Sequence, residues 1–241
     1  MRKTILTHFY NEEYLLPWWL KHHKDRFDWG VCINYGSTDN SVEIIKDICP
    51  KWVVVDSIND LFDARLCDEE VKKYEKQIPG WKVTLNVTEF LVGNFSILND
   101  TPDQELIVPC HVMVDLDSDS PPLVNLPLIE QKHFGIHYKQ ETKPLRRPRC
   151  IHNKLEVNYP LGRHYENYNC EELQICWYGW SPYTASMVKR KLQIQNKIPD
   201  SDKAQGFGRE HVTSLDQLFT NYVSLKHLSK DLSKDLNLEV V

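Results

Sequence analysis

Short apolar runs and amphipathic stretches alternate strictly over the first 90 residues, and this rhythm restricts the possible folds more than any other feature of the sequence. The apolar and β-branched runs predict strands at residues 4–10, 29–34, 52–56 and 81–86. The stretches between them predict helices at residues 12–25, 37–49 and 60–77. Because strands that alternate with helices pair in parallel through right-handed crossovers, the predicted fold class is α/β.

Polar clusters follow three of these strands. The first strand runs into Asn11, Glu12 and Glu13, the second ends at residues 34–39, and the fourth ends at residues 86–89. The carboxyl ends of adjacent parallel strands form a common crevice, which is where open α/β sheets bind ligands. The three clusters therefore predict a site for a nucleotide-like ligand.

The rhythm changes after residue 90, where short strand-like pieces lie among proline-rich turns and predict an α+β half. These pieces occupy residues 105–115, 132–139, 150–157 and 173–178. Residues 197–209 are predicted to form a loop, and the end of the chain is predicted to be an amphipathic helical segment that packs on the core. The predicted organisation is one domain over residues 1–212, divided at residue 92 into two halves, followed by a helical segment over residues 213–241.

Composition excludes several classes of protein. The hydrophobic share of 41% and the charged share of 26% are ordinary for a globular chain. A net charge of -5 argues against binding to nucleic acid, and the basic segments 143–149 and 189–191 are interpreted as solvated charge or as a local basic face. Seven scattered cysteines with no C-x-x-C pair predict reduced thiols in a cytoplasmic protein. No apolar run reaches the roughly 20 residues of a transmembrane helix.

Several segments of the sequence, taken in order, resemble the GT-A glycosyltransferases of the family 2 type. The segments that match lie at residues 11–13, 16–23, 34–41, 81–90, 128–130, 146–149 and 162–164. The resemblance implies a Rossmann-like nucleotide-sugar-binding half with a mixed sheet, over residues 1–92. It also implies an α+β acceptor half over residues 93–212.

The resemblance assigns candidate donor contacts to the first half of the chain. Phe9, Asn11 and Glu12 would surround the base and ribose, although residues directly after a strand also cap the following helix. Asp39 could accept from the base or ribose, or serve only as a helix N-cap. The remaining candidate donor contacts in this half are Gly36, Arg65, Asn86 and Thr88. In the second half, residues 206–211 could form a lid over the donor from which Arg209 and His211 reach the phosphates.

The main departure from the family pattern lies at the metal motif. Relatives carry Asp-x-Asp-Glu, whereas this chain has Asn86, Val87, Thr88 and Glu89. An amide and a hydroxyl bind hard cations less well than carboxylates do. Glu89 could still hold Mn²⁺ or Mg²⁺, alone or with His164, which could equally be structural. Without a metal, the diphosphate charge would be met by Arg65, Lys189, Arg190 or Arg209.

The acceptor half contains the candidates for catalysis. An inverting transferase needs one base within reach of the acceptor hydroxyl, and Asp115, Asp117 and Asp119 follow a predicted strand. The alternative is an exposed acidic turn. An aromatic cluster suits either sugar stacking or core packing, and it consists of Trp177, Tyr178, Trp180 and Tyr183.

The sequence therefore favours an enzyme that transfers a sugar from a UDP- or GDP-sugar to a hydroxyl of a glycan, lipid or other acceptor, with inversion. The loss of two carboxylates at Asn86 and Thr88 supports an alternative, a catalytically degenerate GT-A module that binds carbohydrate or a partner. A third reading, transfer to a nucleobase in DNA, is disfavoured by the acidic net charge.

Overall fold

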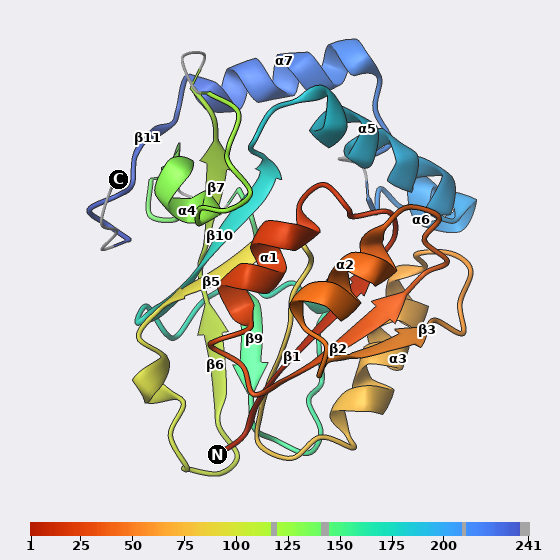
Figure 1. Ribbon diagram of the computed structural model, residues 1–241, viewed down its shortest axis with the longest axis vertical. Coiled ribbons are helices and arrows are strands. Elements are labelled where there is room, and N and C mark those ends of the chain that lie inside the picture. Colours follow the sequence, from red (N-terminus) through yellow and green to blue (C-terminus); the bar gives the residue numbers. More distant parts are fainter. Residues whose placement is uncertain (117–119, 141–144, 209–210, 237–241) are drawn as a thin grey trace.

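We describe the fold from a computed structural model, which places residues 1–116, 120–140, 145–208 and 211–236. Within these residues the chain forms a mixed α/β structure around two mixed sheets (Figure 1). The strands of the first sheet are β1 (Lys3–Phe9), β2 (Trp29–Asn34), β3 (Val53–Asp56), β4 (Trp81–Thr84), β6 (Glu105–Val108) and β9 (Arg149–His152). Those of the second sheet are β5 (Glu89–Gly93), β7 (Cys110–Val114), β8 (Phe134–Ile136), β10 (Leu173–Trp180) and β11 (Lys230–Asp231).

The helices lie between and around the sheets. The α-helices are α1 (Leu16–His23), α2 (Ser41–Ile48), α3 (Ala64–Glu75), α4 (Leu128–Gln131), α5 (Ala185–Gln193), α6 (Asp200–Ala204) and α7 (Leu215–Lys226). The short 3-10 helices are η1 (Phe95–Ile97), η2 (Leu161–Arg163) and η3 (Ile194–Lys197).

The first sheet has the strand order β3-β2-β1-β4-β9-β6. Its first four strands are parallel, as the alternation of strands and helices predicted. β9 then runs antiparallel to both β4 and β6, which makes the sheet mixed. The second sheet has the order β11-β8-β7-β10-β5, in which β10 is parallel to β7 and antiparallel to β5.

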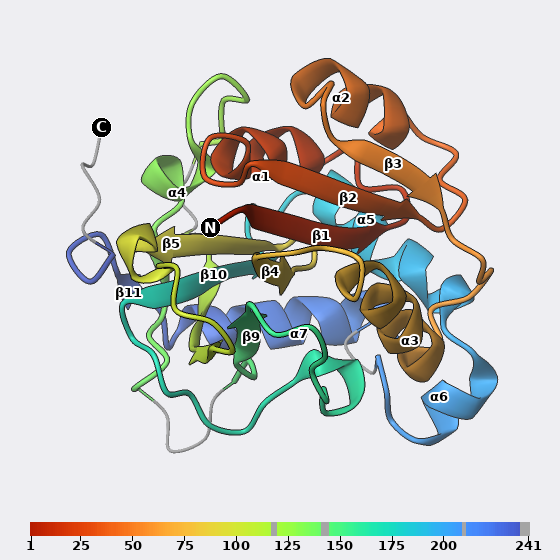
Figure 2. The ribbon, with the colours of Figure 1, turned by 90° about the horizontal axis from the view of Figure 1, so that it is seen from below.

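Alternation along β1 and β2 produces two apolar faces. Ile5 and Cys32 belong to the cluster with Ile45 of α2, whereas Leu6 and Val31 pack in a separate cluster with α3. Figure 2 shows the corresponding layers, with α1 and α2 on one face of the first sheet and α3 on the other. The two central strands are therefore covered on both sides, which is typical of parallel sheets.

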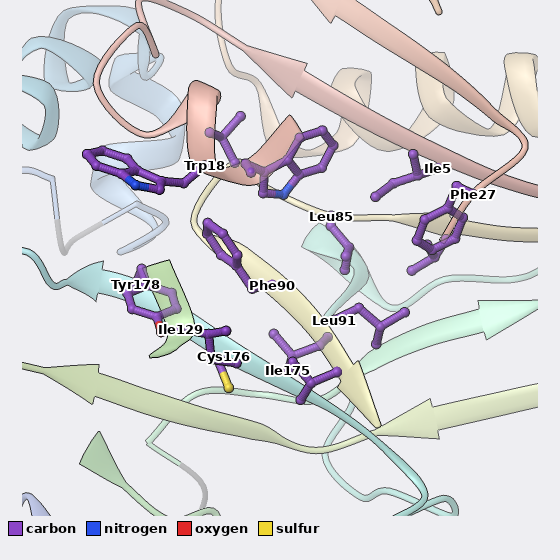
Figure 3. Close-up of a cluster of buried hydrophobic side chains, with 14 of the residues drawn as sticks. Ile5, Trp18, Phe27, Leu85, Phe90, Leu91, Ile129, Ile175, Cys176 and Tyr178 are labelled. Carbon is purple, nitrogen blue, oxygen red and sulfur yellow. The ribbon is translucent and has the colours of Figure 1, made fainter. Parts of the chain in front are cut away.

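The largest buried cluster continues from α1 into the second sheet. Trp18 of α1, Phe90 of β5 and Ile175 of β10 all belong to it, and Figure 3 shows their side chains converging between the ribbons. Trp19 lies in the same cluster, and its Nε1 donates to the backbone oxygen of Glu89 at 2.9 Å. The two sheets thus share one core, and the start of β5 is fixed within it.

Three sequence-based predictions about local structure are wrong. Residues 105–115 form two strands in different sheets, because Pro109 separates them and has no N–H to donate to a ladder. The predicted loop 197–209 contains α6. The C-terminal helix ends at Lys226 and is followed by β11, which pairs with β8.

The C-terminal helix packs on the core, as the sequence predicts. Leu218 and Tyr222 of α7 pack against Val112, Ile136 and Trp177, so this helix lies on the second sheet as expected. All seven cysteines are free and buried. Within the described residues, no helix combines the length and the apolar character that crossing a membrane requires.

Candidate functional site

A cavity of about 200 Å³ opens where β1 and β4 end side by side. Its walls come from the ends of these strands, from α3 and α5, and from the loops that lead into and follow β9. Phe9, the last residue of β1, and Asn86, which follows β4, both line the cavity. This position, at the carboxyl ends of parallel strands, is the one that the polar clusters of the sequence predicted.

The back of the cavity is built on Glu89, whose side chain is completely buried. One of its oxygens, Oε1, accepts from Nη2 of Arg146 at 2.7 Å and from Nε and Nη2 of Arg149 at 2.9 and 2.7 Å. Burial raises the pKa of Glu89, but the charges and hydrogen bonds of Arg149 and Arg146 outweigh it and hold this pKa well below its usual value. The carboxylate of Glu89 therefore pairs with the guanidinium groups of both Arg146 and Arg149.

Asn86, at the start of the segment predicted as a degenerate metal motif, faces the same arginines. The backbone N–H of Asn86 donates to Oε2 of Glu89 at 2.9 Å. When the Asn86 carboxamide is oriented so that both its oxygen and its nitrogen have suitable hydrogen-bond neighbours, the oxygen accepts from Arg146 and Arg149 at 3.2 and 3.1 Å. The Thr88 hydroxyl accepts from Nε1 of Trp177 at 3.1 Å. The motif thus interacts with cationic and N–H groups.

His164 lies beside this cluster and lines the cavity. The positive charge of Arg149 is the main cause that lowers the pKa of His164, followed by burial and by Arg146, so its ring is neutral at pH 7. Its buried Nδ1 has no hydrogen-bond partner among the described residues. Across the described part of the chain, no group of three or more His, Cys, Asp or Glu side chains is arranged to hold a metal ion.

Two further ion pairs fix the walls of the cavity. Arg163 pairs with Asp68 of α3, which also accepts from the backbone N–H of Gly162 at 2.7 Å. Arg190 of α5 binds both oxygens of Glu12, through Nε and, at 2.6 Å, through Nη2. Burial raises the pKa of Glu12 despite the opposing effect of Arg190. The second pair ties α5 to the loop that follows β1.

Cationic side chains outnumber carboxylates around the cavity. Among the described residues, its lining contains five cationic side chains and three carboxylates, with Glu89 behind the wall as a fourth acid. Arg146 and Lys191 approach the Trp177 ring, at 4.6 and 5.7 Å from its centroid. The surplus of positive charge makes the cavity suitable for an anionic group.

Aromatic rings form another part of the wall. Phe62 lines the cavity and stacks on Tyr35 with ring centroids 4.5 Å apart, while His8 packs on Phe62 at 5.7 Å. Burial, reinforced by Arg163 and Arg149, lowers the pKa of His8 from 6.5 to about 3, so this ring is also neutral. Such a wall offers apolar ring surface to a planar ligand.

A second groove, of about 780 Å³, adjoins the cavity, and Arg190 lines both. Its lining includes Asn11, Asp39 and Lys189. The carboxylate of Asp39 accepts from the backbone N–H groups of Glu13 and Ser41, each at 3.0 Å. The groove is therefore bordered by the polar loops that follow β1 and β2.

The predicted site residues are thus divided between several places. Those that line the cavity are Phe9, Glu12, Asn86, Thr88, His164 and His211. Asn11 and Asp39 line the adjoining groove instead. The carboxylate of Asp39 accepts from the backbone N–H of Glu13, which lines the same groove. Arg65 and Gly36 are exposed and line neither space.

Asp115, a candidate base, is buried at the end of β7. Its carboxylate accepts from the Ser181 hydroxyl and, at 2.6 Å, from the backbone N–H of Tyr183, and it holds the turn that leads into α5. It lines neither the cavity nor the groove. Three other candidates, Asp117, Asp119 and Arg209, lie outside the described residues.

The sequence interpretation missed the arginines that dominate this site. The segment 143–149 was interpreted as solvated charge or a basic face, yet Arg146 and Arg149 are buried while Arg147 between them is exposed. Nothing in a basic segment next to a strand indicates that two of its arginines will pair with one distant carboxylate, that of Glu89. Of the aromatic cluster, Trp177 lines the cavity, whereas Tyr178 is buried with its hydroxyl donating to the Lys132 carbonyl at 2.7 Å.

Comparisons with known proteins give distant matches. No protein-family model matches this sequence, and no curated protein matches it. Among solved structures, the chain is similar to S. aureus TarS 1-349 in complex with UDP-GlcNAc, with a TM-score of 0.39 and 13% identity over 82% of this chain and 66% of that chain. The complex of TarS 1-349 with UDP gives a TM-score of 0.37 and 12% identity, over 64% of this chain and 47% of that chain.

A further crystal structure of S. aureus TarS gives a TM-score of 0.33 and 15% identity, over 51% of this chain and 23% of that chain. The chain therefore spans less than two thirds of the length of each of these structures. Because the superpositions are this distant, we argue the function from the geometry of the site.

Proposed function

We propose that this protein is a GT-A type glycosyltransferase, which binds a UDP- or GDP-sugar in the cavity and transfers the sugar, with inversion, to a hydroxyl of a glycan, lipid or other acceptor. The observation that carries the proposal is the surplus of buried positive charge beside an aromatic wall, at the carboxyl ends of β1 and β4. A nucleotide-sugar needs both features, because it combines a planar base with a diphosphate.

The parts of the donor can be assigned to the two kinds of wall. The aromatic wall that contains Phe62 would receive the base, together with Phe9. The cationic residues of the lining would receive the diphosphate, with His211 as a further contact. A 200 Å³ cavity is too small for a whole nucleotide-sugar, so the sugar would extend towards the adjoining groove.

The adjoining groove is the proposed acceptor site. Its carboxylates, amides and hydroxyls, among them Asn11, Tyr14 and Asp39, suit the hydroxyl-rich surface of a sugar. The Glu12–Arg190 pair lies at the border of the two spaces and would hold α5 in position beside the donor. The base that takes the proton of the acceptor would be one of the aspartates that follow β7 in the sequence, Asp115, Asp117 or Asp119, and Asp115 would first have to release Ser181 and Tyr183.

One observation favours a second candidate, a catalytically silent module that binds carbohydrate or a partner. Asn86 and Thr88 stand where relatives carry carboxylates, and the carboxylate of Asp115 is engaged by Ser181 and Tyr183. Such a module would bind a nucleotide or a glycan without turning it over.

Calorimetry against a panel of UDP- and GDP-sugars, followed by assay of donor hydrolysis and transfer, tests both candidates. Binding of one nucleotide-sugar together with release of its nucleotide above the blank supports the transferase. Binding without any turnover, on any acceptor, supports the silent module. Failure of every nucleoside diphosphate to bind the folded protein would overturn the transferase.

A further inference from the structure

We infer that this site neutralises a diphosphate with Arg146 and Lys191, supported by Arg149, and uses no divalent cation. The inference rests on the proposed function, because it specifies how the donor pocket of that enzyme meets the charge of its ligand. It departs from what the resemblance implies, since the family pattern places metal-binding carboxylates at this strand end.

The oxygen atoms at the motif are already engaged by N–H donors. Glu89 gives one oxygen to two arginines and the other to the backbone N–H of Asn86. The Asn86 carboxamide oxygen faces the arginines, and the Thr88 hydroxyl accepts from Trp177. Mn²⁺ or Mg²⁺ would have to displace hydrogen bonds from these oxygens before it could coordinate them, and those at Glu89 and Asn86 are charge-assisted.

The electric field at the motif also opposes a cation. Arg146, Arg149 and His164 line the same cavity, and among the described residues the two guanidinium groups share the single carboxylate of Glu89. The net positive charge of these two arginines and one carboxylate repels a dication placed beside them. His164 would in any case supply a nitrogen ligand, whereas proteins usually hold Mg²⁺ through one or two carboxylates together with the phosphates of the substrate.

Arg149 is suited to a supporting role. Its Nη1 donates to the carbonyls of Gly162 and Arg163 at 2.8 and 3.2 Å, while Nε and Nη2 donate to Glu89. These bonds hold the guanidinium group at the back of the cavity with 2% of the residue exposed. Arg149 thus contributes fixed positive charge without having to move when the ligand arrives.

Arg146 and Lys191 are suited to direct contact. Both line the cavity, and Arg146 shares the Glu89 oxygen with Arg149, so that the three groups keep a net positive charge. Both approach the Trp177 ring, and Lys191 also lies 3.9 Å from the centroid of the Trp180 ring. An arginine and a lysine held on aromatic surface match a diphosphate, the first by paired hydrogen bonds and the second by point charge.

The test is calorimetric titration of the whole protein with inorganic pyrophosphate, UDP and GDP, once in EDTA and once with Mn²⁺ at millimolar concentration. The inference expects pyrophosphate and one nucleotide to bind in EDTA, with dissociation constants that Mn²⁺ changes by less than about threefold once formation of the metal–ligand complex in solution is accounted for. Tightening by tenfold or more in Mn²⁺ would overturn it while leaving the transferase in place.

A matched pair of variants identifies the contact. Arg146→Gln should weaken pyrophosphate binding by about 10- to 100-fold, the usual effect of losing hydrogen bonds to a charged group. Arg147→Gln, which removes the same charge from the exposed neighbour, should change it by less than twofold. Equal effects of the two variants would overturn the assignment of Arg146. Arg149 keeps Glu89 paired in both variants, so both should fold, which circular dichroism checks.

The two proposals fail in distinguishable ways. Pyrophosphate binding in EDTA without binding of any nucleotide would support the metal-free anion site and overturn the transferase. Nucleotide binding only in Mn²⁺ would do the reverse. No binding of either ligand in either buffer would overturn both.

Discussion

Arg149 donates through Nε and Nη2 to the same oxygen of Glu89, at 2.9 and 2.7 Å, and so joins the first residue of β9 to the first residue of β5. The two strands belong to different sheets. This bidentate ion pair is therefore a buried clamp between the sheets at the back of the cavity. It links the stability of the core to the charge of the site.

The first prediction concerns this clamp. Glu89→Gln should lower the free energy of unfolding by about 3–5 kcal/mol, because it leaves two buried guanidinium groups without their carboxylate. Urea denaturation monitored by circular dichroism measures the change. Glu69→Gln, an exposed change of the same kind on α3, should stay within about 0.5 kcal/mol. A Glu89→Gln protein as stable as the Glu69→Gln control would contradict the clamp.

The second prediction concerns acid stability. Burial lowers the pKa of His111 from 6.5 to about 4, despite the hydrogen bond of its Nε2 with Gln174. Between these values the unfolded chain binds a proton that the folded chain does not, so His111 stabilises the fold above pH 6.5 and loses this contribution as the pH falls to 4. His111→Gln should reduce the slope of unfolding free energy against pH in this window by about 1.4 kcal/mol per pH unit. An unchanged slope, equal to that of the exposed control His227→Gln, would be inconsistent with this assignment.

The third prediction compares two ion pairs. Glu12 and Arg190 are each 6% exposed, whereas Lys76 and Glu156 are 55% and 73% exposed. A double-mutant cycle with glutamine replacements should give a coupling free energy of about 2–3 kcal/mol for the first pair. The second pair should give less than about 0.5 kcal/mol, because water screens it. Similar couplings would show that the Glu12–Arg190 pair does not hold α5 in place.

The fourth prediction concerns Gly179, which lines the cavity. A Cβ atom at this position would lie 2.1 Å from the Trp177 ring, and that ring is fixed by its hydrogen bond to Thr88 and by Arg146 above it. Gly179→Ala should therefore displace the indole and weaken pyrophosphate or nucleotide binding by about tenfold or more, one tenfold step being about 1.4 kcal/mol.

Gly206→Ala provides the control for Gly179. A Cβ there would meet no atom within 4 Å, although its φ of +79° is unfavourable for alanine. It should cost about 1 kcal/mol of stability. Because Gly206 does not line the cavity, although it begins the segment predicted as a lid, binding should weaken by less than about threefold. Tight binding by Gly179→Ala in calorimetry would count against Trp177 as the platform of the anion site.

The fifth prediction tests whether one restored carboxylate recreates a metal site. In Asn86→Asp the new carboxylate should pair with Arg146 and Arg149, whose Nη2 atoms already lie 3.2 and 3.1 Å from the side-chain oxygen. The variant should show no rise in melting temperature on addition of 1 mM Mn²⁺, and should bind pyrophosphate more weakly because the surplus charge falls. A Mn²⁺-dependent rise in Asn86→Asp, absent from the wild type, would refute this expectation.

Local sequence patterns gave the layout of the first half of the chain. The parallel strands β1 to β4, the helices between them and the meeting of Phe9 with Asn86 at one edge of the sheet all follow from alternation and from polar strand ends. The position of Glu89 directly after this edge was also evident. Such features depend on neighbours in sequence, so one sequence is enough to predict them.

The same local patterns do not predict which charged residues pair when they are far apart in the sequence. The sequence suggests a metal ligand at Glu89 and does not predict its pairing with Arg146 and Arg149, 57 and 60 residues later. Asp39 was expected beside Phe9, but its carboxylate turns to the backbone of Glu13 and lies in the adjoining groove. Which charged groups pair depends on which segments of the chain approach one another in space. Local periodicity in the sequence does not determine that approach.

By itself, then, the sequence determined the α/β half and the edge of the sheet where a ligand would lie, because the alternation of apolar and polar residues controls which faces are buried. The tertiary structure decided the electrostatic character of that edge. Only when β9 packs beside β4 do two arginines reach the buried Glu89, and this pairing places fixed positive charge at the end of β4.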